Sequence, residues 1–303
     1  MNVLLTGASG LIGMAARQSL AKAGHKIVAV DMTSFDRSDP ELHRIPLEHR
    51  IALEQLANEE QVEAIVHCGA ISGPMMAKGE PLKLVTVNID ATAFLLDLAR
   101  RMAMRRFVFC SSISVYGDVG PQLITEATPL RPTSVYGATK AACEQLIQGM
   151  SVEYGLSGVS LRIARVYGPY RRAHCHLKTL IEDAESGRAS EIPCEPDFLY
   201  HYVYADDVAE AIRVALEAPA LPQREYNVGS GEALTMPLII ARAGTALPGL
   251  QASLVPGKDD VPDVQTAFDV SSIQRDLGWQ PAFPIERGLA AYREAIRAGT
   301  AAP

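Results

Sequence analysis

Apolar and polar positions alternate along the first half of the chain in two distinct patterns. Short apolar runs, typical of buried strands, lie at 2–6, 26–30, 63–68, 106–112 and 157–164. Longer stretches with apolar residues at helical spacing lie between them, at 11–24, 52–60, 81–102 and 139–154. This alternation predicts an α/β fold of the Rossmann type, a doubly wound parallel sheet with helices on both faces. A ligand is then expected at the carboxyl ends of the strands.

The pattern changes after about residue 170, where proline and glycine become frequent and the expected elements shorten. We expect this part to form a smaller α/β lobe that closes over the ligand edge of the sheet. The predicted division is a first domain of 1–168, joined by part of 202–230, and a substrate-binding lobe formed mainly by 169–303.

Composition narrows the classes of function. The 303 residues carry a formal net charge of −7, which argues against a nucleic-acid or membrane-surface partner because such binders need a basic field. No apolar run is long enough to span a bilayer, and Met1 leads directly into an apolar strand instead of a secretory signal. The five cysteines are widely spread, as expected for reduced thiols. We expect a cytoplasmic protein with a small-molecule substrate.

The stretch LLTGASGLIG carries Gly7, Gly10 and Gly13 between an expected strand and an expected helix. Glycines here allow a tight turn and let backbone N–H groups approach a pyrophosphate at the helix N-terminus. Asp31 ends the second strand, where a carboxylate can accept hydrogen bonds from an adenosine ribose and would repel a 2′-phosphate. No arginine stands directly beside Asp31 in the sequence, so the pattern predicts NAD rather than NADP, bound by the first domain.

Tyr136 and Lys140 in YGATK are four residues apart and share one face of a helix. A free tyrosine has a pKa of about 10, too high for a base near neutral pH, so its phenolate needs a neighbouring positive charge. Ser112 ends the preceding strand at the same ligand edge and could bind the same substrate oxygen. We therefore expect Ser112, Tyr136 and Lys140 to be the catalytic residues.

These motifs resemble those of the extended short-chain dehydrogenase/reductase superfamily, of the NAD-dependent epimerase/dehydratase type. TGASGLIG, HCGA, SSISVYG, YGATK, YVYADDVAEA and DVSSIQRDLGWQPAFPIERGL are each similar to a motif of that superfamily, and together they span nearly the whole chain. The resemblance implies hydride transfer between a carbinol carbon and the nicotinamide. Tyr136 would then be the general base or acid, Lys140 would stabilise the phenolate and hold the nicotinamide ribose, and Ser112 would orient the substrate oxygen.

The resemblance also implies that Asn88 helps to order the site. The expected cofactor-binding residues are Gly7, Ser9, Gly10, Leu11, Ile12, Gly13, Asp31, Cys68, Gly69, Ala70, Asn88, Tyr136 and Lys140.

The chain departs from the nucleotide-sugar members of this superfamily at three positions of the expected substrate site. Arg165 stands where they usually have an asparagine that reaches the phosphates, and Tyr200 and Lys258 stand where they usually have arginines. An arginine fork suits a carboxylate or a single phosphate, so we expect an anion-holding edge centred on Arg165. The expected substrate-binding residues are Ser72, Ser112, Ser114, Arg165, Arg171 and His174.

Two further segments near the expected pocket leave their roles open. Met75 and Met76 either line the pocket or simply pack. His174, Cys175 and His176 lack a fourth ligand at a recognisable spacing, so we expect no metal.

Three functions follow in order of preference. The first is an NAD-dependent oxidoreductase acting at a hydroxyl carbon of a small sugar, sugar acid or hydroxy acid. The alternative is a UDP-sugar 4-epimerase-type enzyme with transient reduction of NAD; a dehydratase is disfavoured because no acidic residue follows Ser112 in SSISVYG. The most remote is a non-catalytic NAD-binding sensor, which the Tyr136–Lys140 pair disfavours. By resemblance we expect a homodimer in which the helices 81–102 and 139–154 pair across a two-fold axis.

Overall fold

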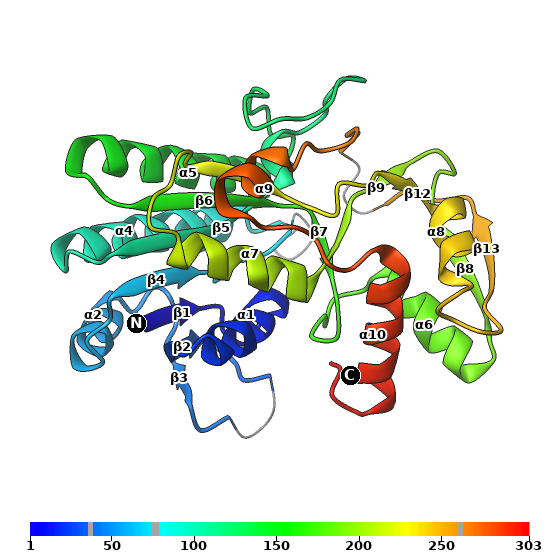
Figure 1. The fold of residues 1–303 in the computed structure, drawn as a ribbon, viewed down its shortest axis with the longest axis horizontal. Coiled ribbons are helices and arrows are strands. Elements are labelled where there is room, and N and C mark those ends of the chain that lie inside the picture. The colour runs from blue at the N-terminus through cyan, green and yellow to red at the C-terminus, as the bar shows by residue number, and fades with distance from the viewer. Residues whose placement is uncertain (36–38, 74–78, 260–262, 303) are drawn as a thin grey trace.

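A parallel sheet of seven strands forms the larger part of the molecule (Figure 1). The computed structural model describes residues 1–35, 39–73, 79–259 and 263–302, so Met75 and Met76 lie outside the described residues. The strands of the sheet, in spatial order, are β11 (Glu225–Val228), β6 (Gly158–Ile163), β5 (Arg106–Ser112), β4 (Ala64–His67), β1 (Asn2–Thr6), β2 (Lys26–Asp31) and β3 (Leu42–Arg44). The predicted Rossmann-type fold is confirmed.

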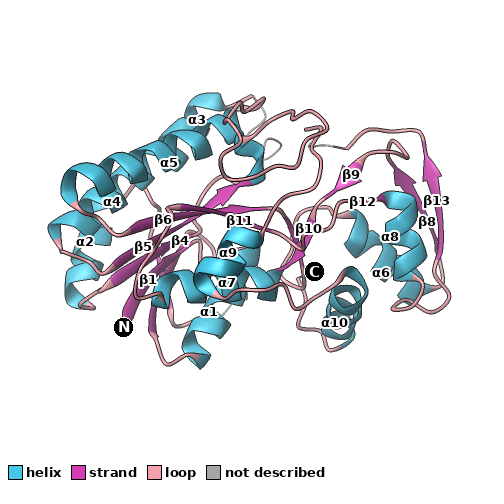
Figure 2. Cartoon of the chain, turned by 45° about the horizontal axis from the view of Figure 1, so that its top comes forward, coloured by secondary structure: helices cyan, strands magenta, loops and turns pink. Residues whose placement is uncertain are grey.

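Helices cover both faces of the sheet, which is why its central strands read as continuous apolar runs (Figure 2). One face carries α1 (Leu11–Lys22), α7 (Ala205–Glu217) and α9 (Ser271–Leu277), and the other carries α2 (Arg50–Glu59), α4 (Ala91–Arg101) and α5 (Val135–Tyr154). Leu20 and Ile212 are fully buried on the first face, as are Leu53 and Leu95 on the second. No helix in the described ranges is both long and apolar enough to cross a membrane.

The C-terminal part of the chain builds a smaller lobe with its own apolar core, at the right of Figure 1. Its helices are α6 (His176–Ser186), α8 (Met236–Ala243) and α10 (Ile285–Arg297). Its strands form three pairs: parallel β8 (Ala189–Pro193) with β13 (Gln251–Val255), antiparallel β9 (Leu199–Tyr200) with β12 (Leu234–Thr235), and parallel β7 (Arg165–Tyr167) with β10 (Tyr202–Tyr204). Leu177, Ile239 and Leu289 are fully buried where the helices meet.

Two helices differ from the sequence-based expectation in ways that matter for the site. α5 begins at Val135 instead of 139, because the Ser134 hydroxyl accepts a hydrogen bond from Gly137 N at 3.1 Å and caps the helix. The expected helix 81–102 is divided into α3 (Pro81–Val85), a π-helical turn at Thr86–Asp90 and α4. Such turns occur frequently at functional sites, and this one contains Asn88.

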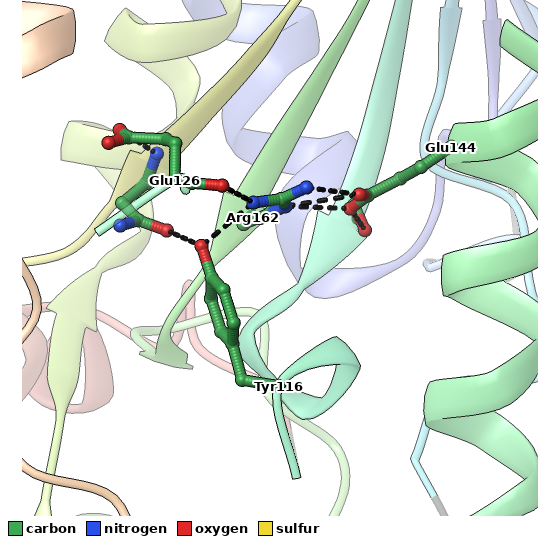
Figure 3. A network of polar contacts seen from close by, with 6 residues as sticks. Tyr116, Glu126, Glu144 and Arg162 are labelled. Atoms are coloured by element: carbon green, nitrogen blue, oxygen red, sulfur yellow. Dashed lines mark hydrogen bonds and ion pairs between the residues drawn. The ribbon is translucent and has the colours of Figure 1, made fainter. Parts of the chain in front are cut away.

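A buried ion pair joins α5 to the sheet (Figure 3). Arg162 on β6 donates to both carboxylate oxygens of Glu144 on α5, with an Nη2–Oε2 distance of 2.8 Å. Ser111 on β5 donates a further hydrogen bond to the same carboxylate. The Glu144 and Arg162 side chains are at most 5% exposed, so neither can exchange its partner for water.

The same arginine extends the network toward β11. Its Nη1 donates to the Tyr116 hydroxyl at 3.0 Å and to the backbone carbonyl of Glu126 at 2.9 Å. The Tyr116 hydroxyl in turn donates to Asn227 Oδ1 at 2.7 Å, and burial raises the pKa of Tyr116 to about 12. One connected set of polar groups therefore ties α5, β5, β6 and β11 together.

Replacing Glu144 with Gln removes the charge that compensates Arg162. We expect the free energy of unfolding to fall by about 3–5 kcal/mol, because an uncompensated buried charge remains in the protein. Urea unfolding followed by circular dichroism measures the change. The matched control is Glu60→Gln, which breaks an exposed pair with Lys26 and should change stability much less. Equal effects of the two variants would contradict this account of the pair.

Candidate active site

In the turn between β1 and α1, the backbone leaves no room for a side chain at Gly7 or Gly13. A Cβ on Gly13 would lie 2.0 Å from the carbonyl oxygen of Gly7, and a Cβ on Gly7 would lie 2.6 Å from Gly69 N. Gly7 also has a φ of +66°, in the left-handed region. Gly10 caps α1, and the backbone N–H groups of Leu11 and Ile12 open its first turn. The close approach of backbone to backbone turns the N-terminus of α1 into a surface that a phosphate can reach.

Asp31, at the carboxyl end of β2, fixes this turn. Its Oδ2 accepts a hydrogen bond from Ser9 N at 3.0 Å, and its Oδ1 accepts one from Met32 N at 2.7 Å. The Ser9 side chain is buried, and its hydroxyl has no hydrogen-bond partner within the described ranges. A buried hydroxyl without a partner beside a helix N-terminus suits a bound pyrophosphate. Glycine turn, free hydroxyl and carboxylate together fit the NAD predicted from the sequence.

Tyr136 and Lys140 project from the first turns of α5 toward the sheet. Both side chains are buried, at 8% and 3% exposure. Lys140 Nζ donates a hydrogen bond to the carbonyl oxygen of Cys110 at 2.8 Å and lies 5.8 Å from the centre of the Tyr136 ring. It also lies 4.6 Å from the centre of the Phe109 ring. The lysine is thus held between β5 and the tyrosine, with its ammonium close to the phenol ring.

Ser112 is the last residue of β5, and the loop that follows it packs against the first turns of α5. Ser112 Oγ accepts a hydrogen bond from Ser114 N at 3.2 Å and caps the short 3₁₀ turn Ile113–Val115. A Cβ on Gly137 would lie 2.4 Å from the carbonyl oxygen of Ser114, so only glycine lets this loop pack on α5 directly after Tyr136. The structure therefore brings the segments of Ser112, Tyr136 and Lys140 together at the carboxyl edge of the sheet. Their catalytic roles stay predictions.

Asn88 connects the π-helical turn to this arrangement. Its Oδ1 accepts a hydrogen bond from Ile71 N at 2.9 Å, and its Nδ2 donates to Ile71 O at 3.2 Å and to Thr139 Oγ1 at 3.0 Å. Thr139 immediately precedes Lys140. Asn88 therefore orders both the backbone beyond β4 and the first turns of α5.

The segment after β4 contains the expected cofactor residues Cys68, Gly69 and Ala70. Gly69 N donates to Thr6 Oγ1 at 3.2 Å, and Ala70 follows it half-buried. Cys68 Sγ lies 3.3 Å from Cys110 Sγ, and this contact, together with burial, raises the pKa of the Cys68 thiol. All five cysteines are free thiols.

The expected substrate residues are placed less uniformly. Arg165, the first residue of β7, forms two hydrogen bonds with Asp259, of 2.9 and 2.8 Å. Arg171 donates to the backbone carbonyls of Val166 and His174, so it braces its own loop. His174 and Ser72 are exposed, and Ser114 is buried at 7% exposure. In the described parts of the chain, no group of three or more His, Cys, Asp or Glu side chains could hold a metal ion.

Two residues that contribute to the site were not predicted from the sequence. The first is Gln265, whose Nε2 donates to the backbone carbonyls of Ile113 and Gly117, both at 3.0 Å. The backbone carbonyl of Gln265 accepts a hydrogen bond from His201 Nε2 at 3.1 Å. It thus links the serine loop to the second lobe across about 150 residues of sequence. On the cofactor side, β3 places Arg44 in register with Asp31, where it donates to Ser34 Oγ. Neither residue lies in a motif, so no local signal marked them.

The glycine turn gives a direct test of the cofactor site. Gly13→Ala places a Cβ against the backbone of Gly7, which cannot yield, so we expect the dissociation constant for NAD to rise at least about tenfold. Isothermal titration with NAD measures it. The control is Gly149→Ala in α5, where no atom lies within 4 Å of the added Cβ; it should bind NAD normally and be slightly more stable. Normal NAD affinity in Gly13→Ala would exclude this turn as the pyrophosphate site.

Comparison with known proteins agrees with this geometry. The UDP-glucose 4-epimerase of Mycolicibacterium smegmatis is 29% identical to this chain, over 98% of this chain and 99% of that protein. A dTDP-glucose 4,6-dehydratase of Haemophilus influenzae is 26% identical, over 95% of this chain and 96% of that protein. The crystal structure of the Thermus thermophilus UDP-glucose 4-epimerase in complex with NAD is similar, with a TM-score of 0.86 and 26% identity over 98% of this chain and 99% of that chain. The family model described as the NAD dependent epimerase/dehydratase family matches residues 3–229. The chain therefore belongs to the NAD dependent epimerase/dehydratase family, the extended short-chain dehydrogenase/reductase enzymes that its motifs indicated.

Proposed function

We propose that this protein is a nucleoside-diphosphate-sugar 4-epimerase that uses NAD. The observation that carries the proposal is that the first turns of α5, with Tyr136 and Lys140, pack against the loop that begins at Ser112, at the sheet edge that also holds the glycine turn. Relatives that match over nearly their whole length act, by their names, on UDP-glucose or dTDP-glucose. An epimerase is favoured over a dehydratase because Ile113 and Ser114 follow Ser112, and neither is acidic.

The side chains divide the chemistry among them. When bound, NAD would accept hydride from the substrate carbon and return it to the opposite face of that carbon, which inverts its configuration. Tyr136 would take the proton of the substrate hydroxyl and give it back to the same oxygen, so one residue is base and then acid. Ser112 would donate a hydrogen bond to that oxygen, and Lys140, fixed by the Cys110 carbonyl, would stabilise the phenolate. Burial of the tyrosine and lysine keeps water away from the transferred proton.

A second candidate is an NAD-dependent dehydrogenase of a small sugar, sugar acid or hydroxy acid. Two observations favour it: Arg165 is engaged by Asp259, and Tyr200 stands where nucleotide-sugar relatives usually carry an arginine. The extent of the match to nucleotide-sugar enzymes supports the epimerase more strongly.

Substrate screening separates the two candidates. Purified protein with NAD is given UDP-glucose, UDP-galactose, free hexoses and aldonates. An epimerase interconverts the two UDP-sugars, seen by NMR, with no lasting absorbance of reduced cofactor. Steady formation of reduced cofactor with a free sugar or aldonate, and no interconversion, would favour the dehydrogenase.

Tyr136→Phe removes only the reacting hydroxyl. We expect turnover to fall by at least about 100-fold, because proton transfer by a positioned group contributes this much or more. The Tyr→Phe control is Tyr292, whose buried hydroxyl has no hydrogen-bond partner in the described structure; its loss should leave turnover unchanged. Full turnover by Tyr136→Phe would end the proposed chemistry.

We also propose that two copies pair through α4 and α5. Leu146 and Tyr154 of α5, 37% and 57% exposed, line a shallow groove together with Leu96 of α4. Leu146→Lys should therefore convert a dimer to a monomer, as measured by light scattering of the complete protein at micromolar concentration. A wild-type monomer under those conditions would refute the pairing.

A further inference from the structure

Arg165 and Asp259 form a two-bonded ion pair that joins segments 94 residues apart. Arg165 Nη1 lies 2.9 Å from Asp259 Oδ2, and Nη2 lies 2.8 Å from Oδ1, so the fork of the guanidinium faces the carboxylate. The guanidinium also lies 5.2 Å from the centre of the Tyr200 ring and 5.9 Å from that of Tyr202. His176 Nε2 lies 3.6 Å from Asp259 Oδ2, the oxygen that also accepts from Arg165 Nη1.

The pair lies at the ligand edge of the sheet. Arg165 is two residues beyond Ile163, the last residue of β6, and Ile163 is the register partner of Ser112 on β5. From there β7 runs beside β10, with Arg165 opposite Tyr202. The arginine side chain keeps 21% exposure, whereas the aspartate keeps 5%. A partly open cation just beyond the strand that pairs with the strand of Ser112 is therefore held by a carboxylate of the protein itself.

A guanidinium fork binds a carboxylate and a phosphate with the same geometry. The Asp259 carboxylate is attached to the same chain, so its effective concentration at Arg165 is high without any ligand. An anionic ligand that uses Arg165 must displace this carboxylate or share the fork with it. The ion pair thus offers such a ligand less net positive charge than Arg165 alone would.

We propose that Asp259 determines the specificity of this site by competing with the diphosphate of the substrate for the fork of Arg165. The inference rests on the proposed function in that the ligand is a nucleoside diphosphate sugar. Asp259 lowers the affinity for the diphosphate, and Arg165 is the residue through which it acts. A pair that served only to hold the fold would have the opposite effect: removing the carboxylate would loosen the lobe and weaken binding.

Titration calorimetry with UDP tests the proposal without turnover. Asp259→Asn keeps the shape of the side chain and removes its charge, and we expect it to bind UDP about tenfold more tightly than wild type. Arg165→Gln/Asp259→Asn should lose this gain, because the competing carboxylate matters only while the arginine is present. Uridine, which has no phosphate, should bind all these proteins equally.

A matched control comes from another arginine–carboxylate pair of this lobe. Glu286→Gln removes a carboxylate from Arg242, which bridges α8 and α10, and should leave UDP affinity unchanged. Thermal melting of each variant shows whether it is folded. If Asp259→Asn is unfolded, Asp259→Ser takes its place with the same expected gain.

Three results would overturn the inference. They are unchanged or weaker UDP binding by a folded Asp259 variant, a gain that persists without Arg165, and a gain for D-glucuronate with none for UDP. None of these depends on catalysis. An inactive wild type with the expected UDP affinities would reject the epimerase and leave the role of Asp259 standing, while an active epimerase without those affinities would do the reverse.

Discussion

The ion pair between Glu144 and Arg162 is the constraint on which the rest of the site depends. Tyr136 and Lys140 lie two and one helical turns before Glu144 on the same helix, so whatever holds Glu144 against β6 also sets how far α5 can slide along the sheet. Ser111, which donates to Glu144, immediately precedes Ser112. The buried Glu144 carboxylate thus holds both α5 and the strand that leads into the serine loop. Forming such a pair costs desolvation energy, but it also favours one arrangement of helix and strand over others.

Close backbone packing at glycine residues also fixes the positions of the loops around the site. Gly137 lets the serine loop touch α5, and Gly7 and Gly69 let the cofactor turn touch the segment after β4, while Gly13 lets α1 approach Gly7. The two contacts lie on neighbouring parts of the same sheet edge. Because glycine carries no side chain, the backbones approach closely at both places, and transfer between a cofactor and a substrate requires such fixed positions.

The second lobe meets this edge through charge and aromatic rings rather than through further catalytic groups. Arg165 stacks near Tyr200 and is held by Asp259, while Gln265 accepts a hydrogen bond from His201 and donates to the serine loop. Burial lowers the pKa of His201 to about 4, so this histidine is neutral near pH 7 and donates through Nε2 to a carbonyl. The residues proposed for catalysis thus lie on the sheet and on α5, whereas Arg165 and Asp259 join two segments of the smaller lobe.

Local sequence determined much of this protein. Apolar periodicity specified five of the seven strands of the sheet and the helices between them, but not β3 or β11. The spacing of Gly7, Gly10 and Gly13 specified the turn, and a separation of four placed Tyr136 and Lys140 on one helix face. These features depend on neighbours within a few residues, so a pattern can carry them. The early start of α5 and the π-helical turn depended on caps and packing that the pattern did not show.

Only the tertiary structure decided that Arg165 would meet Asp259, that Gln265 would bridge the lobes and that Arg44 would lie beside Asp31. The physical reason is that each partner comes from a different strand or loop, and a charge in a sequence does not show which opposite charge the fold will bring to it.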